Sequence, residues 1–185
     1  SRRQTNTIGR LAFCYRTPGT DYYQDPQVLD TLRQAYQAVV QHVTPDGQIK
    51  WADDGAISFA PHEQSWRLEP LLLGYIWVGE KFPPEERKAI ETALQRAAER
   101  LFKSPDTSAN NRGMVWCAVT TLCGLYFDRK DYLALAEPNG VKVINALLKA
   151  DGECSEGAGG DGPDSNYSYT TWSYAYLYRL LSGRG

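Results

Sequence analysis

Three polar, glycine-rich stretches of the chain carry the side chains best suited to chemistry. They read DDGAISFAPHEQSWR, SPDTSANNRGMVW and DGECSEGAGGDGPDSNYSY, and each leads into an apolar segment. Their candidate residues are His62, Trp66, Arg67, Asn110, Asn111, Arg112, Asn166, Tyr167 and Tyr169. Amide and guanidinium donors stabilise a developing negative charge, and tyrosine transfers protons when a nearby cation lowers its pKa from about 10. These loops are therefore the first place to look for a site.

Helical periodicity dominates the segments that must position these loops. Apolar residues recur every third or fourth position from Leu32 to Val43 and again from Ile90 to Leu101, which predicts two amphipathic helices. The runs WRLEPLLLGYIWVG and GMVWCAVTTLCGLYF are apolar on nearly every side, so we expect them to be buried all round. A tyrosine-rich helix over Tyr167–Leu181 joins this inner class, and an outer segment over Val141–Ala150 follows the break EPNG.

The order of these segments predicts an all-α array of helical hairpins. Outer and inner helices alternate, and Trp66, Trp116 and Trp172 open the inner ones at similar spacings, as in a helical repeat. We expect one domain over 1–185, with three hairpins in 28–185 forming an incomplete α/α toroid with inner and outer layers. Residues 1–27 are expected to be an arm and loop, with IGRLAFCYR as a strand or irregular piece. An irregular helical bundle is the alternative.

The longest motifs resemble a known kind of domain. NNRGMVWCAVTTLCGLYFDRKDYLALAE, followed by DGECSEGAGGDGPDSNYSYTTWSYAYLYRLLSG, is similar to the N-terminal helical toroid of heparinase II/III and alginate-lyase-like polysaccharide lyases. YRTPGTDYYQDPQVLDTLRQAYQAVVQHVTPDGQIKW resembles a preceding hairpin of such a domain. The sequence departs from the pattern at Asn-Asn-Arg, where many relatives have His after the Asn, and no β-sandwich follows the helices.

The resemblance implies β-elimination of a uronate-containing polysaccharide. Asn111 and Arg112 would neutralise the carboxylate beside the acidic C5 proton, and Arg67 would assist. Tyr167 would act as the base that removes the C5 proton and then as the acid that protonates the leaving oxygen, with Tyr169 or His62 as the alternative. The remaining substrate contacts would come from Asn110, Trp66 and Asn166.

Each candidate also has a purely structural interpretation. Asn110 or Asn111 can serve as a helix N-cap, and Arg112 can pair with an acidic loop. Tyr174, Tyr176 and Tyr178 are expected to pack their rings, with their hydroxyls reaching water or carbonyls. We also assign Trp51, Trp66, Trp116 and Trp172 to the core, with one of them as a sugar-stacking alternative.

Two other functions remain open from the sequence. A glycoside hydrolase on the same scaffold needs two carboxylates at a fixed separation, and the loops supply Asp53, Asp54, Glu153, Glu156, Asp161 and Asp164. A non-catalytic glycan-binding or assembly fragment is the second alternative. An incomplete toroid exposes an apolar edge, which favours self-association or a companion segment.

Composition limits the partners and the compartment. The net charge of −2 is atypical of a duplex nucleic-acid binder, and no apolar run is long enough for a membrane span. No nucleotide or zinc motif occurs, so we expect no cofactor and no metal.

The segment SRRQTNTIGR lacks the apolar core of a signal peptide. A polysaccharide substrate favours a secreted or periplasmic location, with the cytoplasm as the alternative. The four cysteines are expected as free thiols, or with a Cys14–Cys154 disulfide after export.

Overall fold

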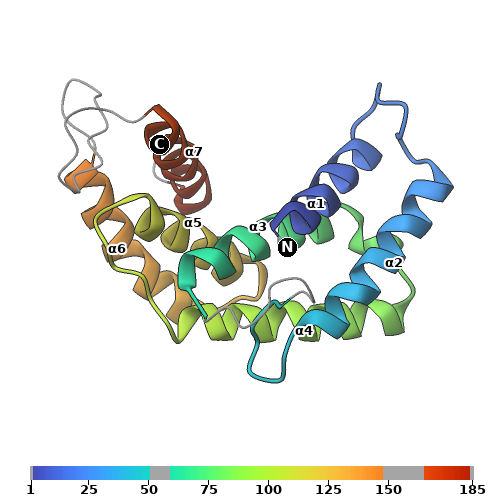
Figure 1. Ribbon diagram of the computed structural model, residues 1–185, viewed down its shortest axis with the longest axis horizontal. Helices are drawn as coiled ribbons and strands as arrows, with labels where there is room; N and C mark the ends of the chain where they lie inside the picture. The colour runs from blue at the N-terminus through green and yellow to red at the C-terminus, as the bar shows by residue number, and fades with distance from the viewer. Residues whose placement is uncertain (1, 51–58, 148–164, 184–185) are drawn as a thin grey trace. The chain divides into compact units, whose positions relative to one another are not determined.

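The computed structural model describes residues 2–50, 59–147 and 165–183, and these residues are almost entirely helical (Figure 1). The elements are α1 (Arg2–Arg16), α2 (Pro26–His42), α3 (Pro61–Val78), the short 3₁₀ helix η2 (Gly79–Lys81), α4 (Pro84–Phe102), α5 (Asn111–Tyr126), α6 (Lys130–Leu147) and α7 (Ser165–Ser182). Within the described ranges the only extended pairing is one bridge between Val43 and Ile49. The predicted all-α class is confirmed.

The chain divides by its internal contacts into two compact units. Unit 1 is Ser1–Arg100 and unit 2 is Leu101–Gly185. Unit 1 contains α1, α2, α3 and most of α4, and unit 2 contains α5, α6 and α7. Each unit is described by itself below. In the described ranges, no helix has both the length and the apolar character needed to span a bilayer.

The N-terminal segment is helical, so the expectation of a strand or irregular arm there is wrong. Thr5, Ile8, Ala12 and Tyr15 are buried along one face of α1, at the spacing of a helix. This face packs on α3 (Figure 1). Thr5 is polar but is fully buried on this face. The sequence alone therefore does not show a continuous apolar stripe along α1.

The core of unit 1 is built around the ring of Tyr36 on α2. Its hydroxyl donates to the Leu71 carbonyl of α3 at 2.7 Å, and its ring lies 5.8 Å from Tyr75 and 5.7 Å from Phe82 between centroids. A Cβ on Gly74 would lie 2.7 Å from the Tyr36 hydroxyl, so only glycine lets the two helices approach this closely. The predicted amphipathic faces of α2 and α4 are the ones that are buried, including Leu32, Val39, Ile90, Leu94 and Ala97.

Helix α5 is the centre of unit 2. Every residue from Asn111 to Gly124 except Arg112 is buried, as its apolar sequence predicts. The indole of Trp116 is fully buried, and its Nε1 donates to the Leu101 carbonyl at 3.1 Å. The core assignment of Trp116 is therefore confirmed.

Helix α6 begins earlier than predicted and continues through the expected break at EPNG. It runs over Lys130–Leu147 with Pro138 inside it. Two side-chain hydrogen bonds to neighbouring carbonyls support the helix around Pro138. The Asn139 Nδ2 donates to the Leu135 carbonyl at 2.9 Å, and the Tyr178 hydroxyl donates to the Glu137 carbonyl at 3.1 Å. Gly140 leaves room for the Tyr178 ring, so tertiary packing holds the helix together across a breaker sequence.

Helix α7 is amphipathic, and the expectation that it is buried all round is wrong. Thr171, Ala175 and Tyr178 face the unit and are buried. The opposite side is solvent-exposed, with exposed fractions of 75% for Tyr169, 44% for Trp172, 65% for Tyr176 and 61% for Leu180. We call these four residues the α7 aromatic face. The core assignment of Trp172 and the expected ring packing of Tyr176 are corrected accordingly, while the ring packing of Tyr178 is confirmed.

Candidate functional site

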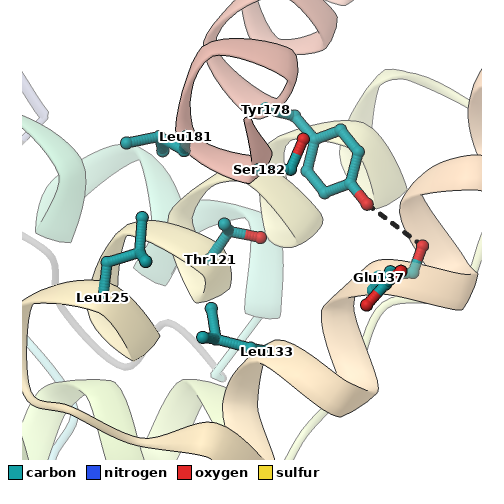
Figure 2. Close-up of a pocket in the computed structure, with 7 residues that line it drawn as sticks. All are labelled: Thr121, Leu125, Leu133, Glu137, Tyr178, Leu181 and Ser182. Carbon is teal, nitrogen blue, oxygen red and sulfur yellow. Dashed lines mark hydrogen bonds between the residues drawn. The ribbon is translucent and has the colours of Figure 1, made fainter. Parts of the chain in front are cut away.

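The N-termini of α5 and α7 lie at the same end of unit 2. The two helices are in extensive contact, and one pocket is lined by Thr121 and Leu125 of α5 together with Tyr178 and Leu181 of α7 (Figure 2). Because the C-terminal halves of the two helices are adjacent, the helices run in the same direction. The loop residues that precede α5 and the first turns of α7 therefore share one end of the unit.

Arg112 and Tyr169 precede the residues of this pocket by the same number of positions on α5 and α7. Thr121 and Tyr178 meet at the shared pocket (Figure 2). Nine residues towards the N-terminus, about 13.5 Å along each axis and about two and a half turns away, are Arg112 on α5 and Tyr169 on α7, each on the face of its helix opposite the pocket. Both residues are exposed, and each points away from the pocket, so the structure does not bring these two predicted catalytic side chains together.

Asn110 is the N-cap of α5, so the structural interpretation of this residue is confirmed. Its side-chain oxygen accepts from the backbone N–H of Arg112 at 3.0 Å and of Gly113 at 3.3 Å. Gly113 is required here because a Cβ would collide with the Ser108 carbonyl. The cap sets the direction of the first turn and leaves the helix dipole pointing its positive end outward.

Asn111 and Arg112 have opposite environments although they are neighbours. Asn111 is buried, with 6% of its surface exposed. Arg112 is exposed, and its guanidinium forms no ion pair with the described part of the chain. A guanidinium at a helix N-terminus favours an anion, because its charge adds to that of the dipole.

Three predicted site residues belong to unit 1, at the start of α3. The buried Arg67 donates from Nη1 to the Ile49 carbonyl at 2.7 Å, and its Nη2 lies 3.9 Å from Glu63 Oε2. His62 and Trp66 form an edge-on ring pair with 5.2 Å between centroids. These contacts give Arg67 a role in holding the turn before α3. The predicted roles of all three in substrate binding stay predictions.

Several candidates cannot be placed. The side chains of Asn166 and Tyr167, in the first turn of α7, lie outside the described residues. So do Trp51, Cys154 and the loop carboxylates Asp53, Asp54, Glu153, Glu156, Asp161 and Asp164. The hydrolase alternative rests on these carboxylates, and the primary choice of base rests on Tyr167.

The pocket shown in Figure 2 is a packing feature between α5, α6 and α7. It encloses about 250 Å³. Its hydroxyls already donate to backbone carbonyls: Thr121 to Cys117, Ser182 to Arg179, and Tyr178 to Glu137. Burial, with a smaller contribution from the nearby Cys117, raises the pKa of Tyr178 above its usual value, so this tyrosine is a poor base.

The buried thiols of α5 are unreactive as nucleophiles, because burial keeps them protonated. Burial, with a smaller contribution from the charge of Asp106, raises the pKa of Cys117 to about 12, and burial also raises the pKa of Cys123. All three described cysteines, with Cys14 half-buried, are free. No cluster of three or more His, Cys, Asp or Glu side chains that could hold a metal occurs in the described ranges.

We therefore predict selective thiol alkylation in the folded protein. At pH 8, iodoacetamide should modify Cys14 readily and leave Cys117 and Cys123 unmodified, because only the thiolate reacts and both α5 thiols are protonated and enclosed. Peptide mass spectrometry before and after denaturation in urea measures this site by site. Rapid native modification of Cys117 would contradict the described packing of α5.

A groove between α1 and α3 in unit 1 was missed by the sequence analysis. It holds about 390 Å³. Its lining residues are Asn6, Gly9, Arg10, Phe13, Glu69, Pro70, Leu73 and Trp77. The rings of Phe13 and Trp77 meet edge-on with 5.5 Å between centroids. Asn6, Arg10 and Phe13 share a helical spacing, but a segment interpreted as an arm gives no reason to place them on one face.

Comparison with known proteins adds no relative. No protein-family model, no curated protein and no solved structure matches this chain. The resemblance to toroid-type polysaccharide lyases therefore rests on the quoted motifs alone. The function is argued next from the geometry of the two units.

Proposed function

We propose that this chain binds an acidic glycan at the end of unit 2 where α5 and α7 begin, and that it cleaves the glycan by β-elimination. One observation carries the proposal: Arg112 is exposed at the N-terminus of α5 and forms no ion pair with the described part of the chain, and α7 of the same unit carries an exposed row of aromatic rings. The row supplies a surface for sugar rings, and the arginine supplies a partner for their carboxylates.

The α7 aromatic face suits a glycan better than a protein partner. Tyr169, Trp172 and Tyr176 follow one another at about 4.5 and 6 Å along the helix axis, which is close to the length of one sugar ring. With side chains of 150–250 Å² and their exposed fractions, the three rings present roughly 400 Å². A standard protein interface needs about 800 Å² per partner, so a second copy docked on this face alone would bind weakly.

Elimination needs a neutralised carboxylate and a base. Arg112, supported by the N-terminus of α5, would hold the carboxylate and stabilise the negative charge that develops when the C5 proton leaves. The Tyr169 hydroxyl would remove that proton and would then protonate the leaving glycosidic oxygen. Tyr167 keeps its predicted place as the alternative base.

We also infer that the hairpins follow the layering of an α/α toroid. In unit 2, α5, which is buried from Gly113 to Gly124, would be an inner helix and the antiparallel α6 an outer one. The parallel direction of α5 and α7 supports this, since successive inner helices of a toroid run the same way. Such a domain would meet its polymeric substrate outside the cytoplasm.

The test is a panel of uronate polymers, with products read by ultraviolet absorbance of unsaturated ends and binding read by calorimetry. We expect Arg112→Ala to lower kcat/KM by about 100-fold or more, as loss of one preorganised donor does. Tyr169→Phe should abolish turnover while leaving binding intact. Lys142→Ala, an exposed cation of α6, and Tyr22→Phe, an exposed loop tyrosine, are the matched controls.

The outcomes separate the alternatives. New reducing ends without ultraviolet absorbance would assign hydrolysis instead of elimination. Binding without any product would assign a non-catalytic glycan-binding role. Absence of binding to every acidic polymer, with the folded state verified by circular dichroism, would overturn the proposal.

A further inference from the structure

The groove between α1 and α3 is formed by an unusually close helix contact. A Cβ on Gly9 would lie 2.8 Å from the Pro70 carbonyl oxygen and 2.9 Å from its Cβ, so glycine brings the α1 backbone directly onto α3. The result is a depression of about 390 Å³, within the usual range of small-ligand sites.

Both helices contribute an aromatic ring and polar side chains to the groove. Half of the Phe13 surface is exposed, and its ring lies against Trp77. Arg10 and Asn6 line the groove from α1, and Glu69 lines it from α3. Rings beside guanidinium, amide and carboxylate groups can contact the apolar face of a sugar and hydrogen-bond to its hydroxyls at the same time.

The charge of α1 selects for an anion. The helix contains four arginines and no acidic residue. Arg3, Arg10 and Arg16 are exposed, and none of them forms an ion pair with the described part of the chain. Of these arginines Arg10 lines the groove, and Glu69 is the one acidic residue in the lining.

We propose that the α1–α3 groove is a second glycan site, which binds one carboxylated sugar residue. Arg10 binds the carboxylate, Phe13 and Trp77 contact the sugar ring, and Asn6 and Glu69 hydrogen-bond to hydroxyls. The choice of an acidic glycan rests on the proposed function, whereas the site itself rests on residues of unit 1 alone.

Calorimetry of the full chain with an oligogalacturonate, and with its methyl-esterified form, tests this site. We expect Arg10→Ala to weaken binding at the groove by at least about tenfold, since a charge-assisted hydrogen bond contributes about 1.5–3 kcal/mol. Arg10→Lys should recover part of the affinity, and Phe13→Ala should weaken it again. Arg16→Ala is the control, because Arg16 is exposed on the same helix and does not line the groove.

Two comparisons make failure of this site distinguishable from failure of the proposed function. If Arg10→Ala loses affinity and Arg112→Ala keeps the affinity of the wild type, the result would support the groove site and count against the site in unit 2. Equal affinities for wild type and Arg10→Ala would overturn the proposed glycan site in the groove, whatever the affinity of Arg112→Ala. Equal losses in Arg10→Ala and Arg16→Ala, or equal binding of the esterified probe, would also overturn it, because either result means that no defined carboxylate contact exists.

Discussion

Replacement of Trp116 by alanine should destabilise unit 2 by about 3–5 kcal/mol, the usual effect of removing a fully buried large aromatic side chain. The change empties the centre of α5 and also removes the donor to the buried Leu101 carbonyl. The free energy of unfolding of a domain of this size is only about 5–15 kcal/mol. The substitution would therefore remove a large part of the stability of the unit. Urea unfolding followed by circular dichroism measures the effect.

Trp172→Ala is the matched control for this prediction. The two residues have the same side chain and open two helices that the sequence does not distinguish, but Trp172 is 44% exposed. We expect its loss to change the free energy of unfolding by less than about 1 kcal/mol. Similar destabilisation by the two alanine variants would mean that α7 is packed differently from the described arrangement.

Gln64→Leu should destabilise unit 1 by about 2–4 kcal/mol, because it leaves several buried backbone groups without partners, each costing about 1–3 kcal/mol. Gln64 is 2% exposed. Its Oε1 accepts from the Ile49 N–H at 3.1 Å, and its Nε2 donates to the Gly47 carbonyl at 2.8 Å and to the Ala97 carbonyl at 3.2 Å. One side chain thus ties the turn after α2 to both α3 and α4.

The control for this variant is Gln41→Leu, on the exposed side of α2. It makes the same chemical change, but it leaves no buried polar group without a hydrogen-bond partner. We therefore expect the free energy of unfolding to change by no more than about 0.5 kcal/mol. Thermal and urea unfolding of the two variants side by side measure the difference. If Gln64→Leu were as stable as Gln41→Leu, the hydrogen bonds of Gln64 would contribute nothing net to the fold.

Helix formation was predictable wherever a helix carries its own apolar pattern. The stripes of α2 and α4 and the all-round apolar character of α5 identified what these helices bury, since each stripe requires a partner surface. The N-cap at Asn110 was also visible as a pattern, because its side chain acts on the N–H groups of its own next residues.

The errors concern features that depend on residues far away in the sequence. Helix α1 buries a threonine against α3, and α6 continues past Pro138 because Tyr178 packs on Gly140. Only the tertiary contact makes either arrangement favourable. The α1–α3 groove escaped notice for the same reason, since its walls come from two helices whose contact is set by Gly9 and Pro70.

By itself, the sequence determined an all-helical chain, the buried faces of α2, α4 and α5, and the cap that places Arg112 at a helix start, because all of these depend on neighbours within a few residues. Only the tertiary structure decided which tryptophan is core and which is exposed. Trp116 and Trp172 sit in similar local patterns, and the difference between them is whether another helix covers the face that carries them. The same packing decides that Tyr169 shares the end of unit 2 with Arg112.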